Sequence, residues 1–190
     1  VSVVGDVDVD AAIAAVAKTL GALPAREPKP ALTELKKITF PAEPFAKAYT
    51  ISSEIPKGNV MVYWPTTDGF EAPRARRLSM LASVLNDRLR VKIREEIGGT
   101  YSPSAGSNAS DTFPGYGYLQ AGCVVEPAQA AQISDLIVAI GEDLAKNGVT
   151  DDELNRMRQP ALTAARESQR TNNFWGGNVL GRAQEKPEVL

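Results

Sequence analysis

Apolar residues recur at helical spacing through the middle of the chain and stop at two consecutive glycines. At helical spacing, one side of this segment contains Leu78, Leu81, Ala82, Leu85, Leu89, Ile93 and Ile97. This period predicts an amphipathic helix. Gly98 and Gly99 then end it, because glycine readily takes the positive φ of a helix C-terminus. Tyr101 begins an extended segment, so Arg94 in the last helical turn and Tyr101 on the incoming strand are expected to face the same space.

The pattern before this helix predicts one helix and several strands. The β-branched run Val1–Val4 is typical of a buried strand, and Asp8 or Asp10 is placed to cap a helix after it. That helix has an apolar stripe of Ile13, Val16, Ala17 and Leu20, and Gly21 ends it. Residues 47–55 alternate and are expected to pair with a strand at 60–64, in which Val60, Val62 and Trp64 share one face and Met61 and Tyr63 the other.

The pattern after the long helix predicts a hairpin and two more helices. Residues 101–109 and 116–125 are expected to pair antiparallel. The next helix carries an apolar stripe of Ile133, Leu136, Ile137, Ile140 and Leu144 and closes at Asn147-Gly148. Residues 150–153 then form a capping box, with Leu154 and Met157 directed inward, and Pro160 is expected to kink that helix or start a new one. The order β-α-β-β-α-β-β-α-α predicts an α+β two-layer sandwich with helices packed on one face of a mainly antiparallel sheet.

Composition narrows the classes of function. The 190 residues are 43% hydrophobic and 23% charged, with a net charge of −2, which argues against nucleic acid or an anionic membrane as the main partner. No apolar run approaches the ~20 residues of a membrane span. The chain has no histidine, which removes Ser-His-Asp catalysis and the usual zinc sites from this segment. Its one cysteine, Cys123, lies in an apolar strand and is expected to be a buried hydrophobe.

Acidic and aromatic clusters suggest little chemistry. The pair Glu95-Glu96 points in different directions on a helix, and the acids at 151–153 suit helix capping, so both groups are expected on the solvated surface. The aromatic residues Trp64, Phe113, Tyr116, Tyr118, Phe174 and Trp175 are scattered and need no role beyond packing.

The basic segment at the end of the long helix has two readings. Arg90, Lys92 and Arg94 offset the partial negative charge of a helix C-terminus, and that alone accounts for them. Alternatively, the planar guanidinium of Arg94 grips carboxylates or carbonyl oxygens of a bound chain, with Tyr101 as a nearby phenolic donor. The residue types by themselves leave both readings open.

Three segments, in order, resemble the M16 metallopeptidases, the pitrilysin, insulinase and mitochondrial processing peptidase family. LRVKIREEIGGTYS (89–102) is similar to an LR-E-x-G-x-x-Y-S signature, VVGDVDVDAAIAAVAKTLGALP (3–24) resembles the opening of a second-type domain, and GVTDDELNRMRQ (148–159) resembles a later helix. The likeness covers nearly the whole chain. It implies one C-terminal-type domain over residues 1–190, with the LuxS/MPP-like metallohydrolase fold.

The resemblance also implies a division of labour between two domains. An active M16 domain carries H-x-x-E-H with a further Glu, and a related domain without zinc closes over it. A chain without histidine is the partner half, with no metal ligand, and zinc is expected in the catalytic domain of its parent. The C-terminal half of the family supplies an arginine and, seven residues on, a tyrosine. These map to Arg94 and Tyr101, which are implied to hold the peptide substrate and stabilise the oxyanion.

Other functions stay open at this point. The chain is expected to be a fragment of a longer protein and inactive on its own, with its zinc-bearing partner in the same chain or in a sister subunit. A scaffold or assembly subunit of the same superfamily, without peptidase activity, is the alternative. A free-standing ligand-binding module is a third possibility. The compartment is open as well, since an exported bacterial enzyme and a cytoplasmic one both agree with the sequence.

Overall fold

The computed structural model describes residues 1–43, 52, 55, 57–97 and 102–181, without the side chains of Arg94, Glu96 and Ile97. The chain divides into two compact units. One consists of residues 1–32 with 160–190, and the other of residues 33–159. The second unit contains the sheet and most of the core, and it therefore positions the predicted site.

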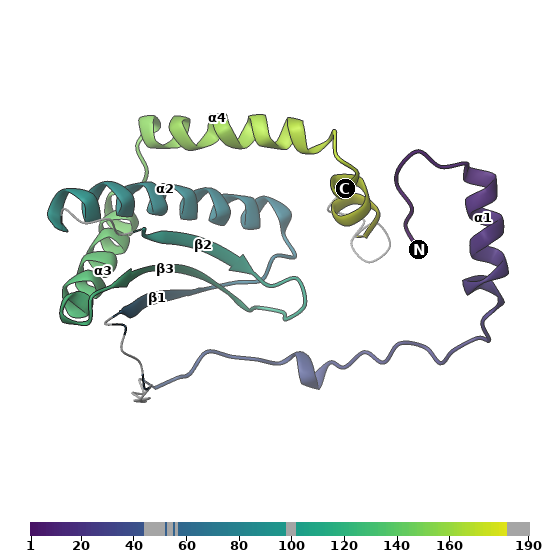
Figure 1. Ribbon diagram of the computed structural model, residues 1–190. Coiled ribbons are helices and arrows are strands. Elements are labelled where there is room, and N and C mark those ends of the chain that lie inside the picture. The colour runs from purple at the N-terminus through teal and green to yellow at the C-terminus, as the bar shows by residue number, and fades with distance from the viewer. Residues whose placement is uncertain (44–51, 53–54, 56, 98–101, 182–190) are drawn as a thin grey trace. The chain divides into compact units, whose positions relative to one another are not determined.

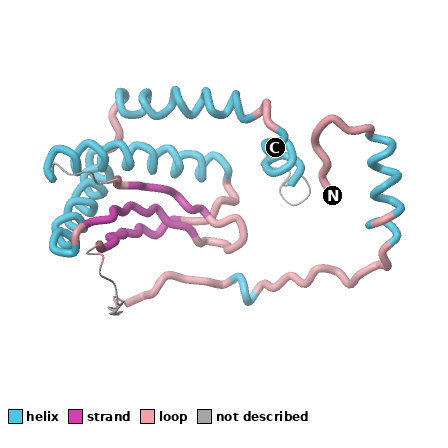
Figure 2. Tube along the Cα trace, viewed as in Figure 1, coloured by secondary structure: helices cyan, strands magenta, loops and turns pink. Residues whose placement is uncertain are grey.

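Three antiparallel strands form the described sheet in the order β1-β3-β2 (Figure 2). Their bounds are β1 (Gly58–Thr66), β2 (Ser104–Ala109) and β3 (Gly117–Val125). In register, Val62 of β1 lies opposite Ala121 of β3, and Ala105 of β2 lies opposite the same Ala121. The predicted hairpin of two antiparallel strands after the long helix is thus confirmed. The strand expected at 47–55 falls mostly on residues outside the described ones, and β1 pairs with β3.

Helix α2 (Ala72–Ile97) is the long helix predicted from the apolar period, and it lies along β2 (Figure 1). Its buried hydrophobic positions are Ala82, Val84, Leu85, Leu89 and Ile93. Pro73 falls in the first turn, where its missing N–H has no helical partner to lose. Leu89 and Ile93 are fully buried, so the face predicted from the sequence is the face that meets the core.

Helix α3 (Ala130–Asn147) packs against β1 and β3. Ile133, Ile137, Ile140 and Leu144 are buried, as the period predicts. Gly141 is a packing residue, because a Cβ there would lie 2.7 Å from the ring of Trp64. Gly148 caps the helix with φ of 75°, a conformation that suits glycine. Together α2, α3 and the sheet bear out the α+β two-layer arrangement, with both helices on the face formed by Val60, Val62 and Trp64.

Helix α4 (Asp151–Ser168) starts at the predicted capping box and runs through Pro160. Pro160 lies inside the helix and does not begin a new one. Met157 packs against the core as expected, but Leu154 is 39% exposed, which corrects the prediction that both point inward.

The unit of residues 1–32 and 160–190 contains α1 (Val9–Lys18) and a π-helical segment, Phe174–Leu180. Asp8 caps α1 by accepting the N–H of Ala11 at 2.8 Å, as predicted. Val1–Val4 does not form the expected strand, since no described strand pairs with it. The apolar stripe of α1 is also not buried: none of its residues is, and Ile13 is well exposed.

Candidate functional site

The predicted site lies where α2 gives way to β2. Arg94 occupies the last turn of α2, directly after the buried Ile93. Tyr101 belongs to residues 98–101, which lie outside the described ones, and so does the side chain of Arg94. The expectation that the guanidinium and the phenol face the same space therefore stays a prediction. What the structure does describe is how the helix and the strand on either side are held.

A side chain of α2 ties the helix to the start of β2. The N–H of Ala105 donates a hydrogen bond of 3.0 Å to Oδ1 of Asn86. Asn86 lies two turns before Arg94 on the same helix. Because a helical side chain satisfies a main-chain donor of the outer strand β2, the strand is anchored to the helix near the corner.

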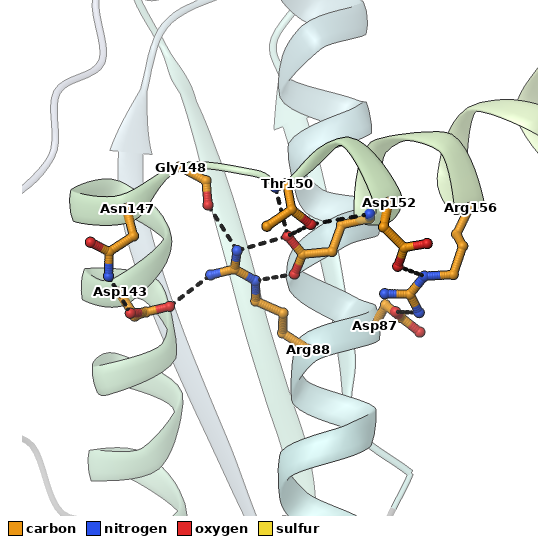
Figure 3. A network of polar contacts seen from close by, with 9 residues as sticks. Asp87, Arg88, Asp143, Asn147, Gly148, Thr150, Asp152 and Arg156 are labelled. Carbon is orange, nitrogen blue, oxygen red and sulfur yellow. Dashed lines mark hydrogen bonds and ion pairs between the residues drawn. The ribbon is translucent and has the colours of Figure 1, made fainter.

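Arg88 links α2, α3 and α4 through hydrogen bonds to three residues (Figure 3). Its Nε and Nη2 donate to the two carboxylate oxygens of Glu153 at 2.6 and 2.9 Å. Its Nη1 donates to Asp143 of α3 at 2.8 Å, and Nη2 also donates to the carbonyl of Gly148 at 2.8 Å. This two-pronged geometry is the one that suits arginine and carboxylate best. The hydrogen bond with Glu153 raises the pKa of Arg88.

Glu153 completes the capping box while it binds Arg88. The Thr150 N–H donates to Glu153 Oε2 at 2.9 Å, and the Glu153 N–H donates back to Thr150 Oγ1 at 3.3 Å. The capping box is therefore confirmed, but the expected solvated surface is wrong for Glu153, whose side chain is only 15% exposed. Its hydrogen bonds, first that of Arg88 and then those of Thr150, lower its pKa from 4.5 to about 2 against the opposing effect of burial.

Asp87 forms a second bridge between α2 and α4 (Figure 3). One carboxylate oxygen accepts from Arg90 at 2.9 Å and the other from Arg156 of α4 at 2.7 Å. Arg156 in turn donates to Asp152 at 3.0 Å. Sequence reasoning missed Asp87 and Arg88 as linking residues. The capping-box residue Glu153 could have indicated such a link, because a partly buried carboxylate between helices needs a basic partner on one of them.

Asp68 anchors the hairpin between β2 and β3 to the loop before α2. Its carboxylate accepts the Gly115 N–H at 2.6 Å and the Phe70 N–H at 3.2 Å, and Arg74 donates to it at 3.3 Å. The hydrogen bond from Gly115 is the largest cause that lowers the pKa of Asp68, with partial burial opposing it. Asp68 therefore fixes the hairpin end of the sheet, which is the end opposite the predicted site.

Among the described side chains there is no group that fits a zinc ion. The chain contains no histidine, and within the described ranges no three His, Cys, Asp or Glu side chains gather closely enough to bind a metal. Cys123 is buried, as predicted, and burial raises the pKa of its thiol, which disfavours the reactive thiolate. Among the described helices, none is long and apolar enough to cross a membrane.

A family model, two relatives and a solved structure are similar to this chain. The family model described as "Peptidase M16 inactive domain" matches residues 1–160. The chloroplastic stromal processing peptidases of Oryza sativa subsp. indica and subsp. japonica are each 27% identical over 100 residues, which are 53% of this chain and 8% of each relative. The crystal structure of the periplasmic protease PqqL from Escherichia coli matches with a TM-score of 0.72 and 20% identity, over 97% of this chain and 20% of that chain. The last likeness shows a shared fold, and this chain spans only a small part of each of these proteins.

Proposed function

The chain belongs to the family of peptidase M16 inactive domains, and we propose that it is the non-catalytic, peptide-binding half of an M16-type zinc endopeptidase. The observation that carries this proposal is the family match over residues 1–160, which includes the α2 corner with Arg94. A zinc-bearing domain, in the same chain or in a sister subunit, would supply the metal. The whole of residues 1–190 would then act as one domain of a longer protein.

Arg94 and Tyr101 are the proposed functional residues of this half. A guanidinium offers a planar pair of donors to carbonyl oxygens, and a phenol offers one more. Donors fixed in this way stabilise the negative oxygen that develops when a peptide carbonyl is attacked. The proposal is supported by the anchoring of α2 at Asn86 and Arg88, because preorganised donors must not reorient during the reaction.

The test is made in the full-length parent with the variants Arg94→Ala and Tyr101→Phe. Loss of a transition-state donor should lower kcat/KM by about 10²-fold or more, mainly through kcat. Arg90→Ala is the matched control, since Arg90 is a cation one turn earlier that pairs with Asp87 on its own helix. Unchanged kcat/KM in both variants would remove the assigned role.

A structural or assembly subunit without peptidase activity is the alternative within the same superfamily. The family description as inactive agrees with it equally well. The parent sequence and its neighbouring subunits distinguish the two, because a peptidase requires H-x-x-E-H in one of them. If no such motif accompanies this chain, the assembly role replaces the peptidase half.

A further inference from the structure

The face of the sheet that points away from α2 and α3 carries no charged residue in its described strands. We call this surface the outer face. It consists of Asn59, Met61, Tyr63, Pro65, Ser104, Gly106, Asn108, Tyr118, Gln120, Gly122 and Val124. An antiparallel sheet that faces water on one side normally alternates apolar with polar and charged residues. The outer face instead combines aromatic rings, neutral amides and a methionine.

Aromatic rings form a continuous row from this face to the adjoining hairpin loop. The ring of Tyr63 meets that of Tyr118 edge-on at 5.4 Å, and Tyr118 meets Tyr116 at 6.2 Å. Asn108 donates a hydrogen bond of 3.2 Å to the Tyr118 hydroxyl. Tyr63 is nevertheless 52% exposed, so one end of the row keeps a free ring surface.

Two neighbouring features make the face adaptable. Met61 lies across Gly122, where any Cβ would collide with its sulfur, and thioether side chains adjust readily to different partners. At the hairpin end, a cavity of about 450 Å³ is lined by Asn108, Phe113, Tyr116 and Tyr118 with other residues of 108–113. The row of rings therefore leads from an exposed tyrosine to a recess with polar and aromatic walls.

The chain itself shows what the hairpin end of this row accepts. Phe40 stacks on Tyr116 with ring centroids 4.8 Å apart and an interplanar angle of 15°. Phe40 precedes Pro41, and a residue before proline is held in extended backbone. An aromatic side chain delivered by an extended, non-helical segment already occupies one position of the row, while Tyr63 offers a second.

We infer that the outer face binds extended, uncharged peptide segments and selects an aromatic side chain at Tyr63 and Tyr118. The inference rests on the proposed function as a peptide-binding half and names the substrate class of that half. A peptide with a charged side chain at this position would lose hydration without gaining an ion pair, since the described outer face has no opposite charge to offer. An aromatic side chain gains both apolar burial and a ring contact.

The experiment measures equilibrium binding of blocked peptides to the 190-residue chain by calorimetric titration. Acetyl-Thr-Phe-Thr-Phe-Thr-amide is compared with the same peptides carrying Leu or Glu in place of both Phe residues. We expect the Phe peptide to bind about fivefold tighter than the Leu peptide, a factor typical of one aromatic pair. The Glu peptide should bind weakest.

Variants assign the preference to the outer face. Tyr63→Ser should abolish the preference for Phe over Leu, and Tyr63→Phe should keep it. Trp175→Ser is the matched control, because Trp175 is an aromatic residue of similar exposure, 46%, outside the sheet. Because Tyr63 is half exposed, its replacement leaves the core intact, which the unfolding midpoint of each variant verifies.

Three results would overturn the inference: no saturable binding, equal affinity for the Phe and Leu peptides, or a preference that survives in Tyr63→Ser. Self-association of the chain that Tyr63→Ser abolishes, without any peptide preference, would assign the face to a second copy instead. None of these results bears on kcat/KM of the Arg94 and Tyr101 variants. A failure here is therefore separate from a failure of the proposed function.

Discussion

Arg88 of α2 binds both carboxylate oxygens of Glu153, the third residue of α4, at 2.6 and 2.9 Å. The two residues are 65 positions apart in the chain, and both side chains are mostly buried, with exposures of 16% and 15%. The pair joins α2, the helix that carries Arg94, to the start of α4. Its stability therefore bears on the proposed site as well as on the fold.

Arg88→Ala should lower the free energy of unfolding by about 2 kcal/mol, because it leaves the carboxylate of Glu153 without its main partner. Urea unfolding followed by circular dichroism measures the loss. Arg170→Ala is the control, since its ion pair with Glu167 is exposed and should contribute less than about 0.5 kcal/mol. Equal effects of the two substitutions would contradict a special role for Arg88.

Glu153 predicts a dependence of stability on acid pH. The pKa of Glu153 is lowered in the folded protein from 4.5 to about 2, so the ion pair contributes fully above pH 4.5. Its contribution falls as the pH drops from 4.5 towards 2, when the folded state too takes up the proton. The stability difference between the wild type and Glu153→Gln should therefore narrow over this interval. A constant difference in unfolding free energy would refute the assignment.

Asp68→Ala should loosen the hairpin between β2 and β3. The substitution removes the acceptor of the Gly115 N–H and of Arg74, at an expected cost of about 2 kcal/mol. The hydrogen-exchange rate of the Gly115 amide should increase by more than the loss of global stability predicts. Asp135→Ala serves as the control, because Asp135 is an exposed carboxylate in α3.

Gly148→Ala should destabilise the protein by about 1 kcal/mol, because a residue with a Cβ is strained at its φ of 75°. The same substitution at Gly21, whose φ is ordinary and whose surroundings leave room for a Cβ, should have little effect. Thermal unfolding of both variants measures the difference. A similar loss at both glycines would contradict the assignment of the cost to the cap conformation of Gly148.

The 190-residue chain by itself should bind no stoichiometric zinc and cleave no peptide. It has no histidine, and the family that it belongs to is described as inactive. Equilibrium dialysis with zinc and mass spectrometry of a peptide mixture measure the two properties. Tight binding of one zinc per chain, or cleavage at a reproducible bond, would contradict the division of labour proposed for the two halves.

Local patterns in the sequence determine much of this protein. The apolar period of α2, the capping box at Thr150 and Glu153, the glycine stop at Gly148 and the hairpin strands all follow from interactions within about four residues or from alternation along one strand. The family could also be predicted from the sequence, because three short segments resemble its signatures in the same order. The family match over residues 1–160 bears this out.

Only the tertiary structure decided which partners meet across long separations. It pairs β1 with β3, and it joins Arg88 to Glu153 and Asp87 to Arg156. It also brings Phe113, Tyr116 and Tyr118 into contact, three of the aromatic residues that the sequence analysis describes as scattered. It also leaves Val1–Val4 outside the described sheet. Periodicity tells which side of an element is apolar, but the identity of the neighbour depends on how the elements pack, and that is a property of the whole chain.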